Sequence, residues 1–326
     1  MTELEQGQEP AREPVREQDD EHDHQHEQHH EQQHREQQYQ REQEHAVGDV
    51  AGDVVTSQSS ADSEEAGVIH LDLLSTSRST DAAYLAAADI ASVTAELDVP
   101  YRLVGGNCVT LLVAAYQVTG IPPRDTADAD LGVGYEVVAD PRLPAALEGR
   151  GYQRTDGNRF ERPLSDEHGT LQLVVDVLAP AYDAKMRTNQ EHGDLVVDEV
   201  PGLGIALVRE PVVVDIDVQL TSGTTVTAQL ALPDPISALC MKATAWAGRF
   251  SARDAFDIWR LLEVAYAAGV KAEKWPLAGS GLDASRVLHR SFATPARDPY
   301  RDAQVPGNVP ARVRALVAEV VAPPAR

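Results

Sequence analysis

Residues 101–133 constrain the fold more than any other part of the chain. A short strand over residues 101–104 is interrupted by Gly105-Gly106, and a helix over about 108–118 follows. That helix is apolar almost all round, which is typical of a buried helix. A proline-containing loop then leads to a second strand over residues 127–133. This alternation of strand and helix predicts an α/β fold with flanking helices.

Three carboxylates lie on the predicted strands. Asp128 and Asp130 are two residues apart, so they share one face of their strand. Asp176 lies in the strand over residues 171–178, on the face opposite to the apolar side chains. Adjacent carboxylates repel each other unless a cation lies between them, and Mg²⁺ prefers oxygen ligands and often bridges carboxylates to phosphates. We therefore expect Asp128, Asp130 and Asp176 to hold magnesium for a phosphoryl displacement.

The two glycines add a second feature of a phosphate site. Backbone without side chains at Gly105 and Gly106 would let amide groups approach a triphosphate at the start of a helix. Asn107 is expected to cap that helix. Neither Gly-Gly nor Asp-x-Asp is specific alone, but together with Asp176 they predict a nucleotide site.

This joint pattern resembles the nucleotidyltransferase superfamily. The matching segments are Val-Gly-Gly at 104–106, Arg-Asp-Thr-Ala-Asp-Ala-Asp at 124–130 and Val-Asp-Val at 175–177. Lys-Ala-Thr-Ala at 242–245, Arg249 and Arg-Asp-Ala-Phe-Asp-Ile at 253–258 extend the resemblance to the AbiEii/AbiGii-type nucleotidyltransferase toxins of bacterial abortive-infection systems. It covers roughly residues 80–265 and implies a nucleotidyltransferase-like mixed sheet with a helical C-terminal region.

The resemblance also implies roles for particular residues. Metal binding falls to Asp128, Asp130 and Asp176, and further catalytic roles to Lys242 and Asp254. The nucleotide-binding candidates are Gly105, Gly106, Asn107, Thr126, Arg249 and Asp257. Asn107 stands where the family usually has Ser or Thr.

The implied reaction transfers a nucleoside monophosphate from an NTP to an acceptor, with Mg²⁺ as cofactor. The resemblance implies RNA, tRNA in particular, as acceptor, and a separately encoded antitoxin as partner. One alternative is a transferase acting on a small molecule such as an aminoglycoside. Another is a catalytically silent nucleotide-binding module, to which only Asn107 points.

Several of these residues have purely structural interpretations. Lys242 and Arg249 are seven residues apart on one helix face and could form a solvated stripe. Asp254 has capping-box spacing after Ser251, and Asp257 could pair with Arg253 one turn earlier. A second pair, Asp215 and Asp217, fits the solvent face of a hairpin over residues 212–220 and 226–232.

Three regions are expected along the chain. Residues 1–66 contain 19 acidic residues, 4 arginines, 7 of the 11 histidines and few apolar residues, which predicts a disordered tail with a possible metal-binding tract. Residues 67–232 are expected to form the α/β core with a β-rich insert, and residues 233–326 a helical region that completes the site. Residues 67–326 carry a net charge of −9, so no general nucleic-acid footprint is present.

The remaining elements follow from periodicity. Helices are expected over about 81–97, 141–149, 233–248, after Ser251, and 310–321. With two cysteines, Cys108 and Cys240, no disulfide framework is possible, and both are expected to serve packing. The sequence lacks a membrane span and a secretory signal, so we expect a cytoplasmic protein without a membrane partner.

Overall fold

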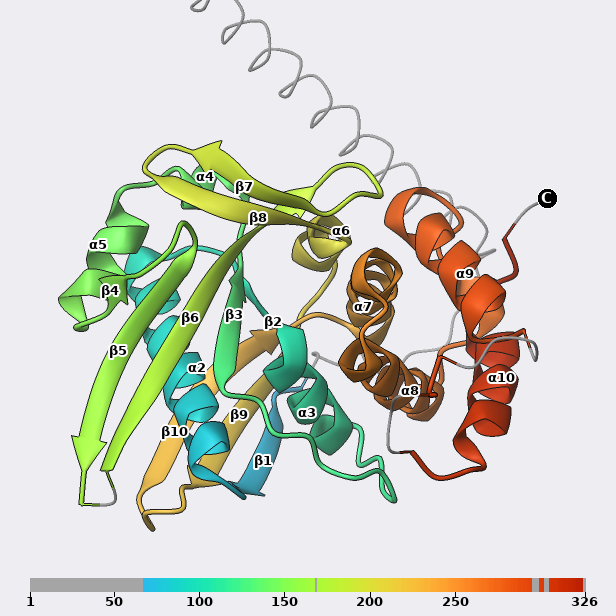
Figure 1. The fold of residues 1–326 in the computed structure, drawn as a ribbon, viewed down its shortest axis with the longest axis horizontal. Coiled ribbons are helices and arrows are strands. Elements are labelled where there is room, and N and C mark those ends of the chain that lie inside the picture. The colour runs from blue at the N-terminus through green and yellow to red at the C-terminus, as the bar shows by residue number, and fades with distance from the viewer. Residues whose placement is uncertain (1–66, 168, 295–298, 302–304, 325–326) are drawn as a thin grey trace, which may run out of the picture. The chain divides into compact units, whose positions relative to one another are not determined.

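The computed structural model describes residues 67–294 apart from residue 168, residues 299–301 and residues 305–324. The predicted tail, residues 1–66, lies outside the described residues. The predicted α/β class is confirmed: two mixed sheets are flanked by helices (Figure 1).

The larger sheet carries the chemistry-bearing strands. Its strands run in the order β2-β3-β6-β5-β4, and β8 pairs with both β6 and β7. The pairs β3–β6 and β6–β8 are parallel, whereas the others are antiparallel. The strands are β2 (Arg102–Val104), β3 (Asp128–Gly132), β4 (Gln153–Arg154), β5 (Arg159–Asp166), β6 (Gly169–Ala181), β7 (Arg187–His192) and β8 (Leu195–Pro201).

Strand β6 pairs with β3, β5 and β8, and its side chains alternate between the core and the opposite face of the sheet. Leu173, Val175 and Val177 are fully buried, whereas Asp176 on the other face is only partly buried. The same alternation in β3 buries Ala129 and Leu131 and leaves the aspartates on the opposite face. The predicted facing of all three aspartates is therefore confirmed.

The smaller sheet contains the predicted hairpin. It consists of β1 (Ile69–Leu74), β9 (Val212–Gln219) and β10 (Thr225–Leu232), with β1 parallel and β10 antiparallel to β9. Val214, Ile216 and Val218 are buried, as the alternation predicts. The hairpin is part of a separate sheet that includes the first described strand.

Helix α2 (Arg78–Leu97) packs against both sheets, and in Figure 1 it lies between them. Its alanine-rich face and Ile90 are buried, so the helix approaches both sheets closely. Its N-cap is Ser77, whose hydroxyl accepts from the Thr80 amide, so the helix begins three residues before the predicted start near residue 81. The other helices up to residue 208 are α3 (Gly105–Ala115), α4 (Tyr135–Val138), α5 (Arg142–Gly149) and α6 (Leu203–Val208).

After Leu232 the described elements are all helical. Asp234 caps α7 and Ser251 caps α8 through side-chain oxygens, as their positions before amphipathic segments favour. Helix α7 packs against α8 and α9, and α10 packs against α8. The elements are α7 (Pro235–Arg249), α8 (Ala252–Ala267), the short 3-10 helix η1 (Ala272–Lys274), α9 (Gly279–Ser291) and α10 (Val309–Val320).

The structure corrects the sequence prediction in two places. Helix α3 begins at Gly105, so Asn107 lies within its first turn, and the N-cap position is Val104. The expected cap by Asn107 is wrong because its amide nitrogen donates instead to the Ala83 carbonyl of α2. The sequence analysis did not predict strands β7 and β8 or helices α6 and α9.

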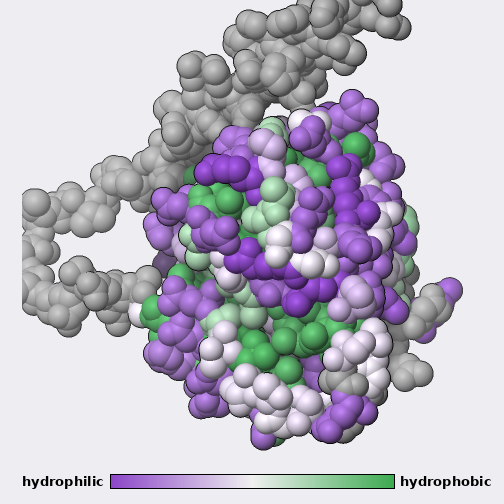
Figure 2. All heavy atoms as spheres, turned by 90° about the vertical axis from the view of Figure 1, so that its left-hand side faces the viewer, coloured by the Kyte–Doolittle hydropathy of each residue, from purple (hydrophilic) through white to green (hydrophobic). Residues whose placement is uncertain are grey.

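Both cysteines are buried free thiols, and burial raises their pKa, in agreement with a packing role. Within the described ranges, no helix combines the length and apolar character that crossing a membrane requires. Figure 2 shows the face at the left of Figure 1, where hydrophilic residues predominate and hydrophobic ones gather in separate patches.

Candidate active site

The sheet brings the three predicted aspartates together. Asp130 lies directly opposite Asp176 in the parallel pairing of β3 with β6, and Asp128 is two residues along β3. All three line one cavity of about 510 Å³, a size within the usual range of small-molecule sites. The sheet therefore supplies one acidic wall of this cavity.

Gly105 is required by the position of Asp130. Its φ of +75° favours glycine, and a Cβ atom there would lie 1.6 Å from Oδ2 of Asp130. The carboxylate of Asp130 is thus seated against the first turn of α3. Gly105 therefore makes room for the Asp130 side chain, in addition to lining the cavity where phosphate contact is predicted.

Gly106 makes room for two other side chains. A Cβ atom there would lie 2.6 Å from Nη1 of Arg124 and 2.8 Å from Oγ1 of Thr126. The Thr126 hydroxyl is buried and has no hydrogen-bond partner among the described residues. The Gly-Gly pair thus packs against the segment that leads into β3, which couples the turn to the position of the aspartates.

Electrostatic repulsion is concentrated on Asp130. Burial and, after it, the negative charges of Asp128 and Asp176 raise the pKa of its carboxyl group to about 7, against the opposing effect of Lys242 and Arg249. A carboxyl group with this pKa is only partly ionised near neutral pH. A cation bound beside it would favour the ionised form.

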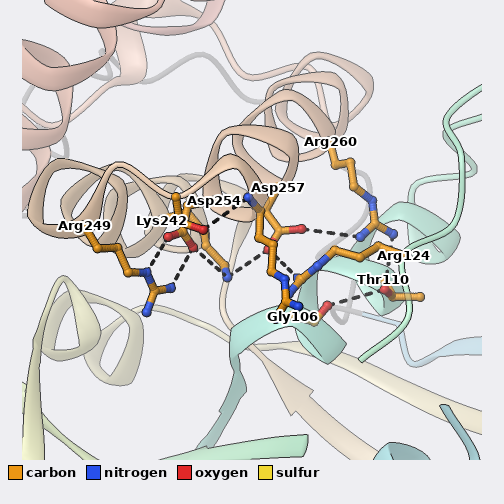
Figure 3. Close-up of polar contacts among 10 residues, drawn as sticks. Gly106, Thr110, Arg124, Lys242, Arg249, Asp254, Asp257 and Arg260 are labelled. Carbon is orange, nitrogen blue, oxygen red and sulfur yellow. Dashed lines mark hydrogen bonds and ion pairs between the residues drawn. The ribbon is translucent and has the colours of Figure 1, made fainter. Parts of the chain in front are cut away.

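The opposite wall comes from α7 and α8 and is basic (Figure 3). Lys242 Nζ lies 2.9 Å from Asp257 and 3.7 Å from Asp254. Arg249 donates twice to Asp254, at 2.5 and 2.8 Å, and Arg124 donates to Asp257 at 2.7 Å. The two carboxylates are almost fully buried, so they hold these cations in fixed positions.

These contacts decide between the alternative interpretations of α7 and α8. Ser251 caps α8 by accepting from the Arg253 amide, whereas the Asp254 carboxylate bonds to Arg249 rather than serving as the cap's partner. Burial tends to raise the pKa of Asp254, but the Arg249 hydrogen bonds and the Lys242 charge outweigh it and leave the pKa lowered. The expected pairing of Asp257 with Arg253 is wrong, since Asp257 pairs with cations on other elements and with Arg260.

Not every predicted residue reaches the cavity. Gly105, Gly106, Asp128, Asp130, Asp176, Lys242, Arg249 and Asp254 line it. Asn107, Thr126 and Asp257 do not line it, because their side chains are buried behind it. A direct contact between a nucleotide and these three residues stays a prediction. The buried position of their side chains does not favour it.

Four charged residues at the cavity were not predicted as site residues: Arg124, Arg159, Asp198 and Arg253. Arg124 precedes Asp128 by four residues within the quoted motif, so its position was visible in the sequence. Arg159 lies outside that motif, and only the register of β5 with β6 places it opposite Asp176.

The fit of a divalent cation depends on which carboxylates are available. Among the residues that the structure describes, no three His, Cys, Asp or Glu side chains form a group able to hold a metal. Asp176 is engaged on both oxygens by Arg159. Asp128 and Asp130 remain, and Mg²⁺ is commonly held by one or two carboxylates together with phosphate oxygens and water. The pair therefore fits a cation that arrives with a nucleotide.

A larger hollow of about 690 Å³ lies between α2 and β10. Of the residues that line it, one, Asp98, is charged. Size alone would favour this hollow, but the convergent charged groups lie in the smaller cavity, and chemistry requires such groups.

No protein-family model matches the sequence, and no curated protein matches it. The structure resembles an antigenic nucleotidyltransferase-like protein from Paracoccidioides brasiliensis, with a TM-score of 0.38, 15% identity, and coverage of 65% of this chain and 88% of that one. It also resembles the antibiotic-resistance factor ANT(2'')-Ia, with a TM-score of 0.30, 13% identity, and coverage of 57% and 89%. Similarity at this level does not establish a function for this chain, so the function has to be inferred from the geometry of the cavity.

Proposed function

We propose that this protein is a nucleotidyltransferase that moves a nucleoside monophosphate from an NTP to an acceptor. The observation that carries the proposal is the division of the cavity into two oppositely charged walls. Asp128, Asp130 and Asp176 lie on the sheet, and Lys242 and Arg249 face them from α7. A triphosphate with its divalent cation has the complementary division of charge.

The basic wall keeps a surplus of positive charge. Asp254 and Asp257 neutralise part of it, but the cavity-lining cations Arg124, Lys242, Arg249 and Arg253 outnumber these two carboxylates. The surplus is available to phosphate oxygens. Lys242 is the best placed of these cations, because it lines the cavity and two buried carboxylates fix its position.

The acidic wall would hold Mg²⁺ through Asp128 and Asp130. A bound cation would supply charge neutralisation at the phosphates. In the proposed reaction an acceptor hydroxyl oxygen bonds to the α-phosphorus, and the bond from that phosphorus to the bridging oxygen of pyrophosphate breaks. The carboxylate of Asp176 is the candidate to receive the acceptor proton. The backbone of Gly105 and Gly106, which lines the cavity at the start of α3, would be the part of this turn that approaches phosphate.

The acceptor is proposed on separate grounds. The sequence resemblance implies RNA, tRNA in particular, and a toxin whose activity a separate antitoxin controls. The net charge of −9 over residues 67–326 favours a small acceptor such as an aminoglycoside instead. A silent nucleotide-binding module is the alternative from a different class, and its only support is the Asn107 substitution.

One assay distinguishes these alternatives. The protein is incubated with each α-labelled NTP and Mg²⁺, in parallel with total RNA and with a panel of aminoglycosides, and the products are separated on gels and thin-layer plates. Label in tRNA supports the toxin, and label in an aminoglycoside supports the small-molecule transferase. Nucleotide binding without transfer to any acceptor supports the silent module. The Asp128→Asn variant is the control for contaminating activity.

A further inference from the structure

Arg159 and Asp176 form the tightest contact on the acidic wall. They lie directly opposite each other in the antiparallel pairing of β5 with β6. Nε of Arg159 donates to Oδ1 of Asp176 at 2.9 Å, and Nη2 donates to Oδ2 at 2.8 Å. A guanidinium that engages both carboxylate oxygens makes a strong and geometrically specific pair.

The other two aspartates have no such partner. Within the described part of the chain, neither Asp128 nor Asp130 forms an ion pair within 4.0 Å. The one cation on the acidic wall is therefore committed to Asp176. This engagement separates Asp176 from the pair on β3.

Arg159 is also placed to leave Asp176. It is the first residue of β5, its side chain is 42% exposed, and it lines the same cavity as Lys242 and Arg249. An anionic ligand in the cavity would compete with Asp176 for the guanidinium. The side chain of Arg249 is also exposed, at 57%, but its partner Asp254 is 1% exposed whereas Asp176 is 14% exposed, so the two pairs differ in the access to the carboxylate.

We propose that Arg159 is a resident counter-ion that withholds Asp176 from divalent cations until a phosphate-bearing ligand draws the guanidinium away. This inference rests on the proposed function and adds a control step to it. Asp128 and Asp130 would provide the first cation contacts, and Asp176 would become available only after Arg159 is released. Arg159 acts here through Asp176 and is a positioning residue.

The test measures cation binding directly, without nucleotide or turnover. Mn²⁺ is titrated into the full-length chain, and free Mn²⁺ is measured by electron paramagnetic resonance. The variants are Arg159→Gln, Asp176→Asn, the double variant and Asp128→Asn. Arg162→Gln is the matched control, because Arg162 lies on the same strand and pairs with Asp89 away from the cavity. Binding by the histidines of residues 1–66 would be common to all variants.

Arg159→Gln is expected to lower the Kd for Mn²⁺ by about fivefold, the order expected when a partly exposed pair no longer competes. The gain should disappear in the double variant, which lacks the carboxylate, and Arg162→Gln should match the wild type. The Kd of Arg159→Lys for Mn²⁺ should lie between those of the wild type and Arg159→Gln, since a single ammonium cannot engage both oxygens in the same way. If Arg159→Gln folds poorly, Arg159→Lys provides the test of the counter-ion role.

An unchanged or weaker Mn²⁺ affinity in Arg159→Gln, with Asp128→Asn still weakening binding in the wild-type background, overturns the counter-ion role and leaves the proposed function standing. A gain that persists in the double variant overturns it as well. If Asp128→Asn has no effect on Mn²⁺ binding, the proposed metal site itself fails, and this inference fails with it.

Discussion

The chain contains two Asp-x-Asp pairs on strands, and their surroundings differ completely. Asp130 on β3 is seated against Gly105 and lies opposite Asp176, in a cavity faced by cations. Asp215 on β9 accepts a hydrogen bond from Gln229 at 2.9 Å and lies 3.5 Å from His70, and Asp217 is exposed. The same local pattern thus gives a strained acidic site in one sheet and an ordinary solvated face in the other.

This difference shows that the neighbours of a carboxylate pair determine its chemistry. The β3 pair is surrounded by α3, by a third carboxylate and by the α7–α8 wall, so its charges are poorly solvated. The β9 pair can be solvated, and its neighbours Gln229 and His70 are polar. Substitutions at matched positions in the two sheets should therefore have different effects.

The largest difference is expected in transfer activity. Asp128→Asn should nearly abolish nucleotide transfer, because the carboxylate pair organises the cation at the reacting phosphates. Asp215→Asn should leave transfer unchanged. In metal-free buffer Asp128→Asn should be as stable as the wild type or slightly more stable, since one repulsive charge is removed. Transfer assays and thermal melts with and without Mg²⁺-NTP check both parts, and wild-type transfer by Asp128→Asn would show that the site is misassigned.

Gly105→Ala should also abolish most of the activity, by displacing Asp130. Its control is Gly223→Ala in the β9–β10 turn, where φ is +84° but a Cβ atom would meet open space. Both variants should lose about 1–2 kcal/mol of stability from the backbone conformation alone. Only Gly105→Ala should lose transfer and Mg²⁺ stabilisation. Equal activity in the two variants would contradict the close fit of Gly105 to Asp130.

Lys242→Ala should have a smaller effect, on nucleotide affinity and on stability together. Removing Lys242 leaves Asp254 with Arg249 and Asp257 with Arg124, so we expect a loss of about 1–3 kcal/mol. Arg249→Ala should cost less, because the Arg249 side chain is 57% exposed. Isothermal titration with Mg²⁺-NTP and denaturant melts provide the measurements. If nucleotide affinity stays at the wild-type level, Lys242 has only a structural role.

A further difference is expected in the pH dependence of stability. The pKa of Asp130 in the folded protein is about 7, above its ordinary value of 3.8, so the folded state binds more protons than the unfolded state between these values. The contribution of this group to stability is therefore fully present below about pH 4 and is lost as the pH rises towards 7. Asp130→Asn lacks this loss.

Melting temperatures with EDTA present test this dependence. The difference between Asp130→Asn and the wild type should shift in favour of the variant from pH 4 to 7 and then level off. Asp217→Asn, on the exposed face of β9, should follow the wild type throughout. A flat difference for Asp130→Asn would mean that its carboxyl group titrates normally.

Local sequence patterns predicted much of the fold and part of the residues that line the cavity. The alternation in β3 and β6 correctly placed Asp128, Asp130 and Asp176 on faces opposite to buried Leu131 and Val175. Strand β7 escaped prediction because polar residues dominate it, and strand β8 was missed although its buried residues alternate. The sequence suggested that Gly105 and Gly106 form a break before the helix and that Asn107 caps it. Helix α3 instead begins at Gly105, so Asn107 lies within its first turn.

The sequence by itself determined which residues could share a face of a strand or a helix, because the repeat of each element is a local property of the backbone. It therefore specified the strand faces that carry Asp128, Asp130 and Asp176, and the position of Lys242 and Arg249 on one helix face. Only the tertiary structure decided which charges meet. Arg159 reaches Asp176 through strand register, and Arg124 reaches Asp257 across 133 residues of sequence. Such contacts depend on how distant segments pack, and that is decided by the whole core.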